Sequence, residues 1–276
     1  MKIQVLNLPI RDCFHPWAYR ERHGYTMEQK ELLRKITEVV RECGEIILHA
    51  DRNKSAVDEK AGHANFVTEY DKRIQQILHK NLLQILPEAV FVGEEEDIHA
   101  SVAKGYAFIV DPIDGTTNFI KDYHMSVISV GLTSDAEKYM GVVYNPYSDE
   151  MFTAVRGEGA CLNDKPIHVS GEALSNGLVL FGTAPYYEEL SKRSFEMAYD
   201  YFKKALDVRR SGSAAYDLCS VAAGRAELFF ELSLSPWDYA AGALILEEAG
   251  GKVTTIEGGP LTLQAGCSVL ATNGIA

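Results

Sequence analysis

The stretch FIVDPIDGTTNF, residues 108–119, places two aspartates three residues apart at the end of an apolar run. The apolar run predicts a short buried strand. Pro112 cannot donate to a sheet ladder, so we expect the chain to turn there. Gly115 permits a sharp or left-handed bend, and Thr116-Thr117-Asn118 favour the start of a helix. The stretch therefore predicts a strand, a turn and a helix, with both carboxylates held at the turn.

The two aspartates, Asp111 and Asp114, have two interpretations. Carboxylates bind hard cations, and N–H groups at a helix start, here those of Gly115 and Thr116, bind phosphate oxygens. Asp, Gly and Asn are also the ordinary residues of turns. Because a turn requires neither both acids nor the threonine pair, the complete stretch favours a site for metal and phosphate.

Two further acids stand beside expected elements. Glu94 follows the apolar run AVFVG (89–93), and Asp238 stands at the start of an alanine-rich helical segment. Each alone is compatible with a solvated loop or a helix cap. If both converge with the first two aspartates, the four carboxylates repel one another unless cations lie between them. Two or three Mg²⁺ ions would meet that requirement.

The composition is that of a globular protein with an acidic surface. The chain has 276 residues, 46% of them hydrophobic, and a formal net charge of -12. This charge argues against nucleic acid and against a membrane surface as partners. It is compatible with a phosphate ester as substrate, provided that divalent cations supply positive charge.

The cysteine pattern and the N-terminus indicate a cytoplasmic protein. The five cysteines are scattered, odd in number and without a C-x-x-C pair, which is typical of free thiols in a reducing compartment. No apolar stretch near the N-terminus has the length of a signal peptide. No segment approaches the roughly 18 apolar residues of a membrane span.

Helices are expected in the first part of the chain. Residues 27–50 carry apolar side chains at the three- and four-residue spacing of an amphipathic helix. The charged stretch 51–65 predicts a mobile loop. A second helix is expected at about 69–86, with Thr68 and Asp71 at the spacing of a capping box.

Strand-like runs fill the middle of the chain, and strands alternate with helices after it. The runs of the middle part are 89–93, 106–111, 126–132, 140–146 and 150–155. A turn-rich stretch at 156–171 is the expected boundary. Beyond it we expect strands at 178–183 and 226–232, helices at about 188–205 and 239–249, and a closing strand pair.

Three parts of the chain follow from this pattern. Residues 1–26 form an N-terminal extension of unknown role. Residues 27–165 form an α+β half that carries the main metal ligands, and residues 166–276 form an α/β half that carries Asp238 and the substrate contacts that a family resemblance implies.

Other phosphate chemistries lack their motifs. GGKVTT (250–255) has Val253 where a phosphate-binding loop requires Ser or Thr, and no G-x-G-x-x-G follows an expected strand. Phosphatases that form an aspartyl-phosphate carry their second carboxylate two residues after the first. Here that position is Ile113, so the spacing favours a metal pair.

Three motifs together resemble the inositol monophosphatase family, within the lithium-sensitive, magnesium-dependent phosphatases. They are GEE (93–95), DPIDGTTNF (111–119) and PWDYAAGALILEEAGG (236–251), and the resemblance covers roughly residues 28–275. It implies a layered αβαβα sandwich of the inositol monophosphatase and fructose-1,6-bisphosphatase type. It also implies a homodimer and sensitivity to lithium.

The resemblance implies specific metal ligands and a catalytic pair. Glu94, Asp111 and the carbonyl of Ile113 would hold one Mg²⁺, and Asp111, Asp114 and Asp238 a second. A weaker third ion would lean on Glu94. Thr116, paired with Asp71, would orient the attacking water and help to deprotonate it.

Substrate contacts are also carried over by the resemblance. Lys60 stands at the position of a loop lysine near the active site. The positions that would contact phosphate or the substrate ring are Asp114, Gly115, Thr116, Gly212, Ser213, Ala214, Glu231 and Asp238. Departures from the family concern the first 26 residues, Asn65 and residues 121–124, and they bear on substrate fit rather than on the metals.

The sequence thus predicts a Mg²⁺-dependent phosphomonoesterase for inositol monophosphate or a related small sugar or polyol phosphate, with direct attack by water. Fructose-1,6-bisphosphatase, NADP phosphatase and 3′-phosphoadenosine phosphatase are alternatives on the same scaffold. A second phosphate would require a second cationic site, and Arg209-Arg210 is the nearby candidate, although a surface pair fits equally well. A non-catalytic binding protein is least favoured, because all four carboxylates and Thr116 are present.

Overall fold

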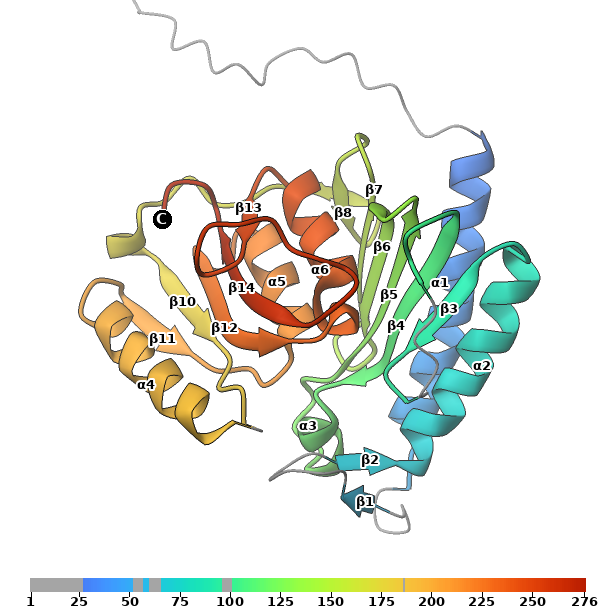
Figure 1. Ribbon diagram of the computed structural model, residues 1–276, viewed down its shortest axis with the longest axis horizontal. Coiled ribbons are helices and arrows are strands. Elements are labelled where there is room, and N and C mark those ends of the chain that lie inside the picture. Colours follow the sequence, from blue (N-terminus) through green and yellow to red (C-terminus); the bar gives the residue numbers. More distant parts are fainter. Residues whose placement is uncertain (1–26, 52–56, 60–65, 96–100, 186) are drawn as a thin grey trace, which may run out of the picture.

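Two large β-sheets, a two-stranded hairpin and the helices around them make up the described part of the chain (Figure 1). The computed structural model describes residues 27–51, 57–59, 66–95, 101–185 and 187–276. Within these residues, no helix combines the length and the apolarity that crossing a membrane requires.

The first sheet has seven strands in the order β3-β4-β5-β6-β7-β8-β9. β3 and β4 are parallel, and every later neighbour is antiparallel. The strands are β3 (Val90–Gly93), β4 (Tyr106–Asp114), β5 (Val127–Ser134), β6 (Glu137–Asn145), β7 (Glu150–Val155), β8 (Ala160–Leu162) and β9 (Lys165–Ile167).

The second sheet has five strands in the order β11-β10-β12-β14-β13. β10 pairs in parallel with β11 and β12, and β14 is antiparallel to both of its neighbours. The strands are β10 (Leu178–Phe181), β11 (Asp207–Arg209), β12 (Leu228–Leu234), β13 (Lys252–Thr254) and β14 (Cys267–Thr272).

Helices cover both sheets and separate them, which gives the expected αβαβα layering (Figure 1). α1 (Met27–Leu48) and α2 (Glu69–Ile85) pack on the outer face of the first sheet. α5 (Ala214–Ala222) and α6 (Pro236–Glu248) lie between the sheets, and α4 (Glu188–Phe202) covers the second sheet.

The middle layer packs closely because glycines of the first sheet face small residues of α6. A Cβ at Gly131 would lie 3.0 Å from the Cβ of Ala240, and one at Gly141 would lie 2.7 Å from the carbonyl oxygen of Ala241. The absent side chains therefore let the helix backbone approach the strands. This contact fixes the distance between the first sheet and α6, and the first turn of α6 carries Asp238.

The predicted capping box of α2 is confirmed. The backbone N–H of Thr68 donates to Oδ2 of Asp71 over 2.8 Å, and Oγ1 of Thr68 accepts from the N–H of Asp71. A short hairpin of β1 (Val57–Glu59) and β2 (Phe66–Thr68) precedes the helix. The loop predicted for residues 51–65 is therefore wrong at 57–59, where antiparallel pairing overrides the charged composition. Residues 52–56 and 60–65 lie outside the described part.

Three other expectations need correction. β4 does not end at Pro112 but continues to Asp114, because a bulge accommodates the proline. The N-cap of the short helix α3 (Thr116–Ile120) is Gly115, which adopts the left-handed conformation with φ 90°. The turn-rich stretch 156–171 contains β8 and β9, which extend the first sheet. The division of the chain at residues 165/166 stays a prediction.

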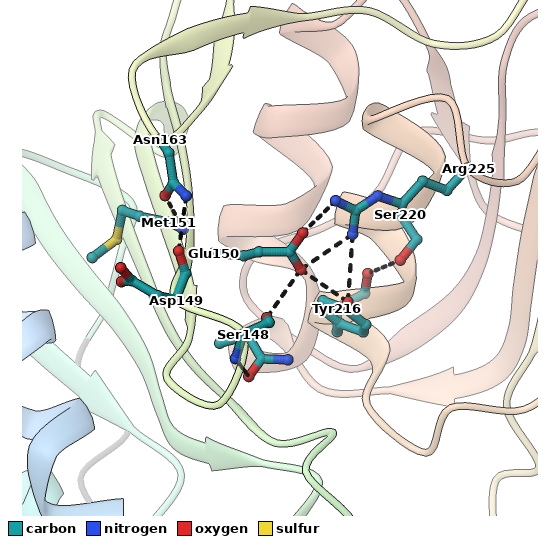
Figure 2. A network of polar contacts seen from close by, with 9 residues as sticks. Ser148, Asp149, Glu150, Met151, Asn163, Tyr216, Ser220 and Arg225 are labelled. Atoms are coloured by element: carbon teal, nitrogen blue, oxygen red, sulfur yellow. Dashed lines mark hydrogen bonds and ion pairs between the residues drawn. The ribbon is translucent and has the colours of Figure 1, made fainter. Parts of the chain in front are cut away.

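A polar network joins the first sheet to α5 (Figure 2). Oε2 of Glu150, the first residue of β7, accepts hydrogen bonds from Ser148 (3.1 Å), Tyr216 (3.0 Å) and Arg225 (3.2 Å). The second guanidinium nitrogen of Arg225 pairs with the other carboxylate oxygen. The guanidinium also lies 5.7 Å from the ring centre of Phe152. These contacts hold the first turn of α5 against the first sheet.

Candidate active site

A cavity of about 720 Å³ opens where the ends of several elements meet. Its walls come from the ends of β3, β4, β10 and β12 and from the starts of α3, α5 and α6. The charged side chains of its lining are those of Arg210 and of Glu94, Asp111, Asp114, Asp217, Glu231 and Asp238. The four predicted metal-binding acids therefore share one cavity.

Asp111, Asp114 and Asp238 form the centre of the site. One carboxylate oxygen from each lies within 4.8 Å of the others. Asp111 and Asp114 are buried, and Asp238 is half-buried. Only oxygen donors are present in this group, and oxygen is the donor that hard cations such as Mg²⁺ prefer.

The bulge in β4 explains how two aspartates three residues apart reach one cavity. Residues i and i+3 of a regular strand point to opposite faces. Here Asp111 pairs with Ser129 of β5, and Asp114 pairs with Val127, only two residues away. The extra residue on β4 turns Asp114 back to the side of Asp111.

Asp238 is the third residue of α6, whose N-cap is Ser235. Its Oδ2 accepts from the backbone N–H of Ser235 over 2.6 Å. Asp71 has the same place in α2, where its Oδ2 accepts from Thr68. In both cases the helix start holds one carboxylate oxygen and so fixes the direction of the other.

The start of α5 holds Asp114. Its Oδ2 accepts from Oγ of Ser213 and from the N–H of Ala215, each over 2.7 Å. Ser213 is also the N-cap of α5. The predicted substrate residues Ser213 and Ala214 therefore adjoin the cluster of Asp111, Asp114 and Asp238, and Ser213 orients one of its carboxylates directly.

The predicted pair of Thr116 and Asp71 is brought together. Oγ1 of Thr116 lies 3.3 Å from Oδ1 of Asp71 and 3.2 Å from the carbonyl oxygen of Ile113. A hydroxyl has one proton, so these two oxygens are alternative acceptors. Asp71 is fully buried. Burial raises the pKa of Asp71 to about 7, against the opposing effect of its hydrogen bonds from Thr68.

The central acids have raised pKa values because they are buried together. Burial, followed by the charges of Glu94, Asp114 and Asp238, raises the pKa of Asp111 well above its usual value. Burial and the charges of Asp114 and Glu94 do the same to the pKa of Asp238. The pKa of Asp114 rises to about 6, since the hydrogen bonds from Ser213 and Ala215 oppose burial. Such crowding fits a site that receives divalent cations.

Glu94 follows β3 directly. Its backbone N–H donates to the carbonyl oxygen of Val110 over 3.2 Å, which extends the parallel pairing of β3 and β4. The next residue, Glu95, is tied by its N–H to the side chain of Gln75 over 2.9 Å. Glu94 is thereby held at the cavity beside Asp111.

The residues predicted to contact phosphate and the substrate ring also line the cavity. Gly115 and Gly212 both have positive φ angles, and a Cβ on Gly115 would lie 3.2 Å from the carbonyl oxygen of Gly212. The side-chain amide of Asn118 bridges the two turns by donating to the carbonyls of Met125 (2.8 Å) and Ser211 (2.9 Å). Glycine is required at position 115 by conformation and by this close approach.

Glu231 lies in β12 with 9% of its surface exposed. Its Oε1 accepts from the N–H of Ala184 over 3.0 Å. Burial raises the pKa of Glu231 to about 7. A Cβ on Gly182, the residue after β10, would overlap the carboxylate of Glu231, so the absence of a side chain there leaves space for that carboxylate.

Sequence reasoning missed Asp217, and it named Arg210 only within the pair Arg209-Arg210, either as a site for a second phosphate or as a surface pair. Asp217 and Arg210 line the cavity, together with the aromatic residues Tyr187 and Trp237. A carboxylate in the otherwise apolar run AAYDLCSVAA was a signal that could have identified Asp217. Lys60, the predicted loop lysine, lies outside the described residues.

Comparison with known proteins agrees with this geometry. The family model described as "Inositol monophosphatase family" matches residues 28–276. Inositol monophosphatase 2 of Solanum lycopersicum is 41% identical over 86% of this chain and 91% of its own length. A putative Nus factor SuhB of Neisseria meningitidis serogroup B is 37% identical over 84% of this chain and 89% of its own.

The fold comparison gives the same family. The crystal structure of the extragenic suppressor protein suhB from Bartonella henselae superposes with a TM-score of 0.81 and 33% identity, over 88% of this chain and 94% of that one. The motif-bearing acids, the layered sheets and the sequence matches agree over nearly all of the described chain. The chain belongs to the inositol monophosphatase family.

Proposed function

We propose that this protein is a Mg²⁺-dependent phosphomonoesterase that hydrolyses inositol monophosphate or a related small sugar or polyol phosphate. The observation that carries the proposal is the convergence of Asp111, Asp114 and Asp238 within 4.8 Å on the wall of the cavity. Membership of the family supports the class of reaction. The all-carboxylate donor set supports the choice of metal.

Two or three Mg²⁺ ions, held by the central aspartates, Glu94 and the carbonyl of Ile113, would stabilise charge on the phosphate and on the leaving alkoxide. The protein's own groups would position the water. Thr116 accepts a proton from the water while its hydroxyl donates to Asp71, whose pKa of about 7 suits a proton acceptor near neutrality. The N–H groups of Gly115 and Thr116 would bind phosphate oxygens, because first-turn N–H groups have no acceptor within their own helix.

The leaving alcohol would lie against the remaining predicted contacts. These contacts are the turn at residues 212–214 and the carboxylates of Glu231 and Asp238. All of them line the same cavity. Lys60 stays a predicted contact.

A substrate panel with Mg²⁺ tests the proposal. The panel comprises myo-inositol 1-phosphate, fructose 1,6-bisphosphate, NADP and adenosine 3′,5′-bisphosphate, each with and without added Li⁺ and EDTA. We expect the first to be hydrolysed best, with inhibition by Li⁺ and loss of activity in EDTA. Asp111→Asn should abolish turnover, whereas the exposed turn variant Asp164→Asn should not. Activity that persists in EDTA would contradict the metal mechanism.

A second candidate function comes from the relatives named as Nus factors SuhB. On this hypothesis the chain acts by binding a macromolecular partner, with or without turnover. Asp111→Asn separates the two functions, since a binding role survives loss of phosphatase activity. A strain that lacks the gene for this chain provides the assay. Full complementation of that strain by Asp111→Asn would favour the binding role.

We further propose that two copies pair through α4. Phe195, Tyr199 and Phe202 lie on one face of this helix and are 58%, 63% and 50% exposed. Glu188 stands at one end of this aromatic row and Lys203 at the other. Two antiparallel copies related by a twofold axis would place the acidic end of each helix beside the basic end of its partner.

Sedimentation measures this pairing directly. We expect Phe195→Ser combined with Tyr199→Ser to convert a dimer to a monomer. Tyr123→Ser removes an equally exposed aromatic residue, 61% exposed, from another surface and should leave the dimer intact. A dimer that survives the double substitution would place the interface elsewhere.

The free thiols of the described cysteines support a cytoplasmic location.

A further inference from the structure

The strand β5 turns one of its two faces toward α6. Successive side chains of a strand alternate between the faces of a sheet. Ile128, Val130 and Leu132 pack in the core cluster that also contains side chains of α1 and α2, so the odd-numbered residues of β5 face the other way. On that side, a Cβ at Gly131 would lie 3.0 Å from the Cβ of Ala240. The odd-numbered face of β5 is therefore the one that meets α6.

Two buried hydroxyl groups lie on this face. Ser129 is 0% exposed and Thr133 is 1% exposed. A buried hydroxyl costs free energy unless it finds a hydrogen-bond partner. Oγ1 of Thr133 donates within the sheet, to the carbonyl oxygen of Ala107 over 3.2 Å. Oγ of Ser129 donates across the interface, to the carbonyl oxygen of Trp237 in α6 over 3.3 Å. The two hydroxyls thus make similar bonds to different layers of the fold.

Ser129 is the neighbour of Asp111 across the strand pair. The two residues stand directly opposite each other in the antiparallel ladder of β4 and β5. Opposite residues of such a ladder carry their side chains on the same face, with Cβ atoms about 4.5–5.5 Å apart. The ladder therefore fixes the position of the Ser129 hydroxyl relative to the backbone of Asp111.

The other end of the hydrogen bond adjoins Asp238. The acceptor carbonyl of Trp237 belongs to the peptide unit that joins Trp237 to Asp238, and this unit is planar, so its oxygen and the N–H of Asp238 move together. That N–H donates to the carbonyl oxygen of Ser235 over 3.1 Å, and Oδ2 of Asp238 accepts from the N–H of Ser235 over 2.6 Å. The bond from Ser129 thereby holds the peptide unit from which Asp238 begins.

We propose that Ser129 is a positioning residue that sets the separation between the carboxylates of Asp111 and Asp238. This inference rests on the proposed function, in which both carboxylates bind Mg²⁺. One of these acids comes from a strand of the first sheet and the other from a helix of the next layer, yet an oxygen of each lies within 4.8 Å of the other. Apolar contact between the layers is not directional. A hydrogen bond is directional, and this one fixes the start of α6 beside Asp111.

Two matched variants test the role of the Ser129 hydroxyl. Ser129→Ala and Thr133→Val each remove one buried hydroxyl from the same face of β5, with bonds of 3.3 and 3.2 Å to their carbonyl oxygens. The carbonyl of Trp237 keeps the N–H donor that a regular helix provides, so we expect Ser129→Ala to fold. Urea titration in EDTA verifies that both variants are folded.

Isothermal titration with MgCl₂ measures the effect on metal binding. We expect Ser129→Ala to bind Mg²⁺ more weakly by on the order of tenfold, as is usual when a group that orients metal ligands is lost. Thr133→Val should bind Mg²⁺ like wild type, because its hydroxyl contacts β4 and not α6. Unchanged affinity in Ser129→Ala, or an equal loss in both variants, would overturn the proposal.

Turnover at increasing Mg²⁺ concentration provides a second readout. The concentration for half-maximal turnover should rise in Ser129→Ala by the same factor as the dissociation constant. At saturating Mg²⁺, kcat should return to within about twofold of wild type, because a positioning role is exerted through the metal ligands and not on the substrate. A fall in kcat that saturating Mg²⁺ does not restore would contradict this role.

Hydrogen exchange in EDTA separates this inference from the proposed function, because it requires neither Mg²⁺ nor turnover. We expect the backbone amide of Asp238 to exchange roughly 2- to 10-fold faster in Ser129→Ala, the effect of one lost hydrogen bond on local opening. Thr133→Val should leave this amide unchanged. If the wild type binds no Mg²⁺, the proposed function fails, and the exchange rates alone decide whether Ser129 holds the start of α6. Equal rates in all three proteins would overturn that role.

Discussion

Replacing Ser213 by alanine should weaken Mg²⁺ binding and lower stability by amounts that the contacts of Asp114 define. Oδ2 of Asp114 accepts two hydrogen bonds of 2.7 Å, from Ser213 and from Ala215, and the variant keeps only the second. A hydrogen bond to a charged group contributes roughly 1.5–3 kcal/mol. The N-cap contact from Tyr216 to Ser213 is long, at 3.4 Å, so its loss adds at most about 1 kcal/mol.

These terms give an expected loss of about 2–4 kcal/mol in the free energy of unfolding. The hydrogen bond from Ser213 lowers the pKa of Asp114 against burial, so its removal raises that pKa further above about 6. Protons then compete with Mg²⁺ for the carboxylate. Loss of a group that orients a metal ligand typically costs about 10- to 100-fold in metal affinity.

Isothermal titration with MgCl₂ at pH 7 measures the affinity, and urea titration in EDTA measures the stability. Ser220→Ala is the matched control, because its Oγ bonds the carbonyl oxygen of Tyr216 in the same helix and does not touch Asp114. We expect the control to bind Mg²⁺ like wild type. If Ser213→Ala loses stability yet binds Mg²⁺ with unchanged affinity, the hydrogen bond from Ser213 does not position Asp114 for metal binding, and the reasoning is refuted.

Three further predictions concern pH, packing and the hydroxyl of the catalytic pair. Burial raises the pKa of Asp71 to about 7, above its unfolded value near 3.9, so the folded metal-free protein retains a proton that the unfolded chain loses. Its free energy of unfolding should therefore fall from pH 4 to pH 7 in EDTA, and Asp71→Asn should reduce the slope of this fall in urea titrations. Gly141→Ala places a Cβ 2.7 Å from the carbonyl oxygen of Ala241 and should cost about 1–3 kcal/mol by urea unfolding, whereas Gly171→Ala, with no atom within 4 Å, should not. Thr116→Ala should lower kcat by about 10²–10⁴-fold with little change in KM, and Thr116→Ser should restore most of it; equal steady-state losses in both variants would exclude the hydroxyl's role.

The sequence predicted the long elements of the fold well because their patterns are local. The helix expected at 69–86 appears at Glu69–Ile85, with its capping box. The short strands β8, β9 and β11 were not anticipated, because strands of three residues are defined by their neighbours in the sheet and not by a periodic pattern. The layering of the two sheets was anticipated from the resemblance alone.

The acids of the site were predictable because the sequence places each of them at the end of an apolar run or at the start of a helical segment. Their geometry was not. The bulge that turns Asp114 toward Asp111 depends on pairing with β5, which lies elsewhere in the sequence. Asp217 lies inside the helix α5, and only the tertiary structure shows that it lines the cavity. The metal-ligand and substrate roles themselves stay predictions.

The short helix α5 has a consequence for how this protein could acquire a new substrate. Its first turn orients Asp114 and also carries Asp217, and the network around Glu150 attaches the helix to the first sheet (Figure 2). A displacement of α5 that enlarged the part of the cavity proposed to hold the leaving alcohol would also misalign the carboxylate of Asp114. Divergence of substrate preference should therefore proceed by exchanging side chains on a fixed backbone, or by remodelling the segment before α4, which contributes Tyr187 to the cavity wall.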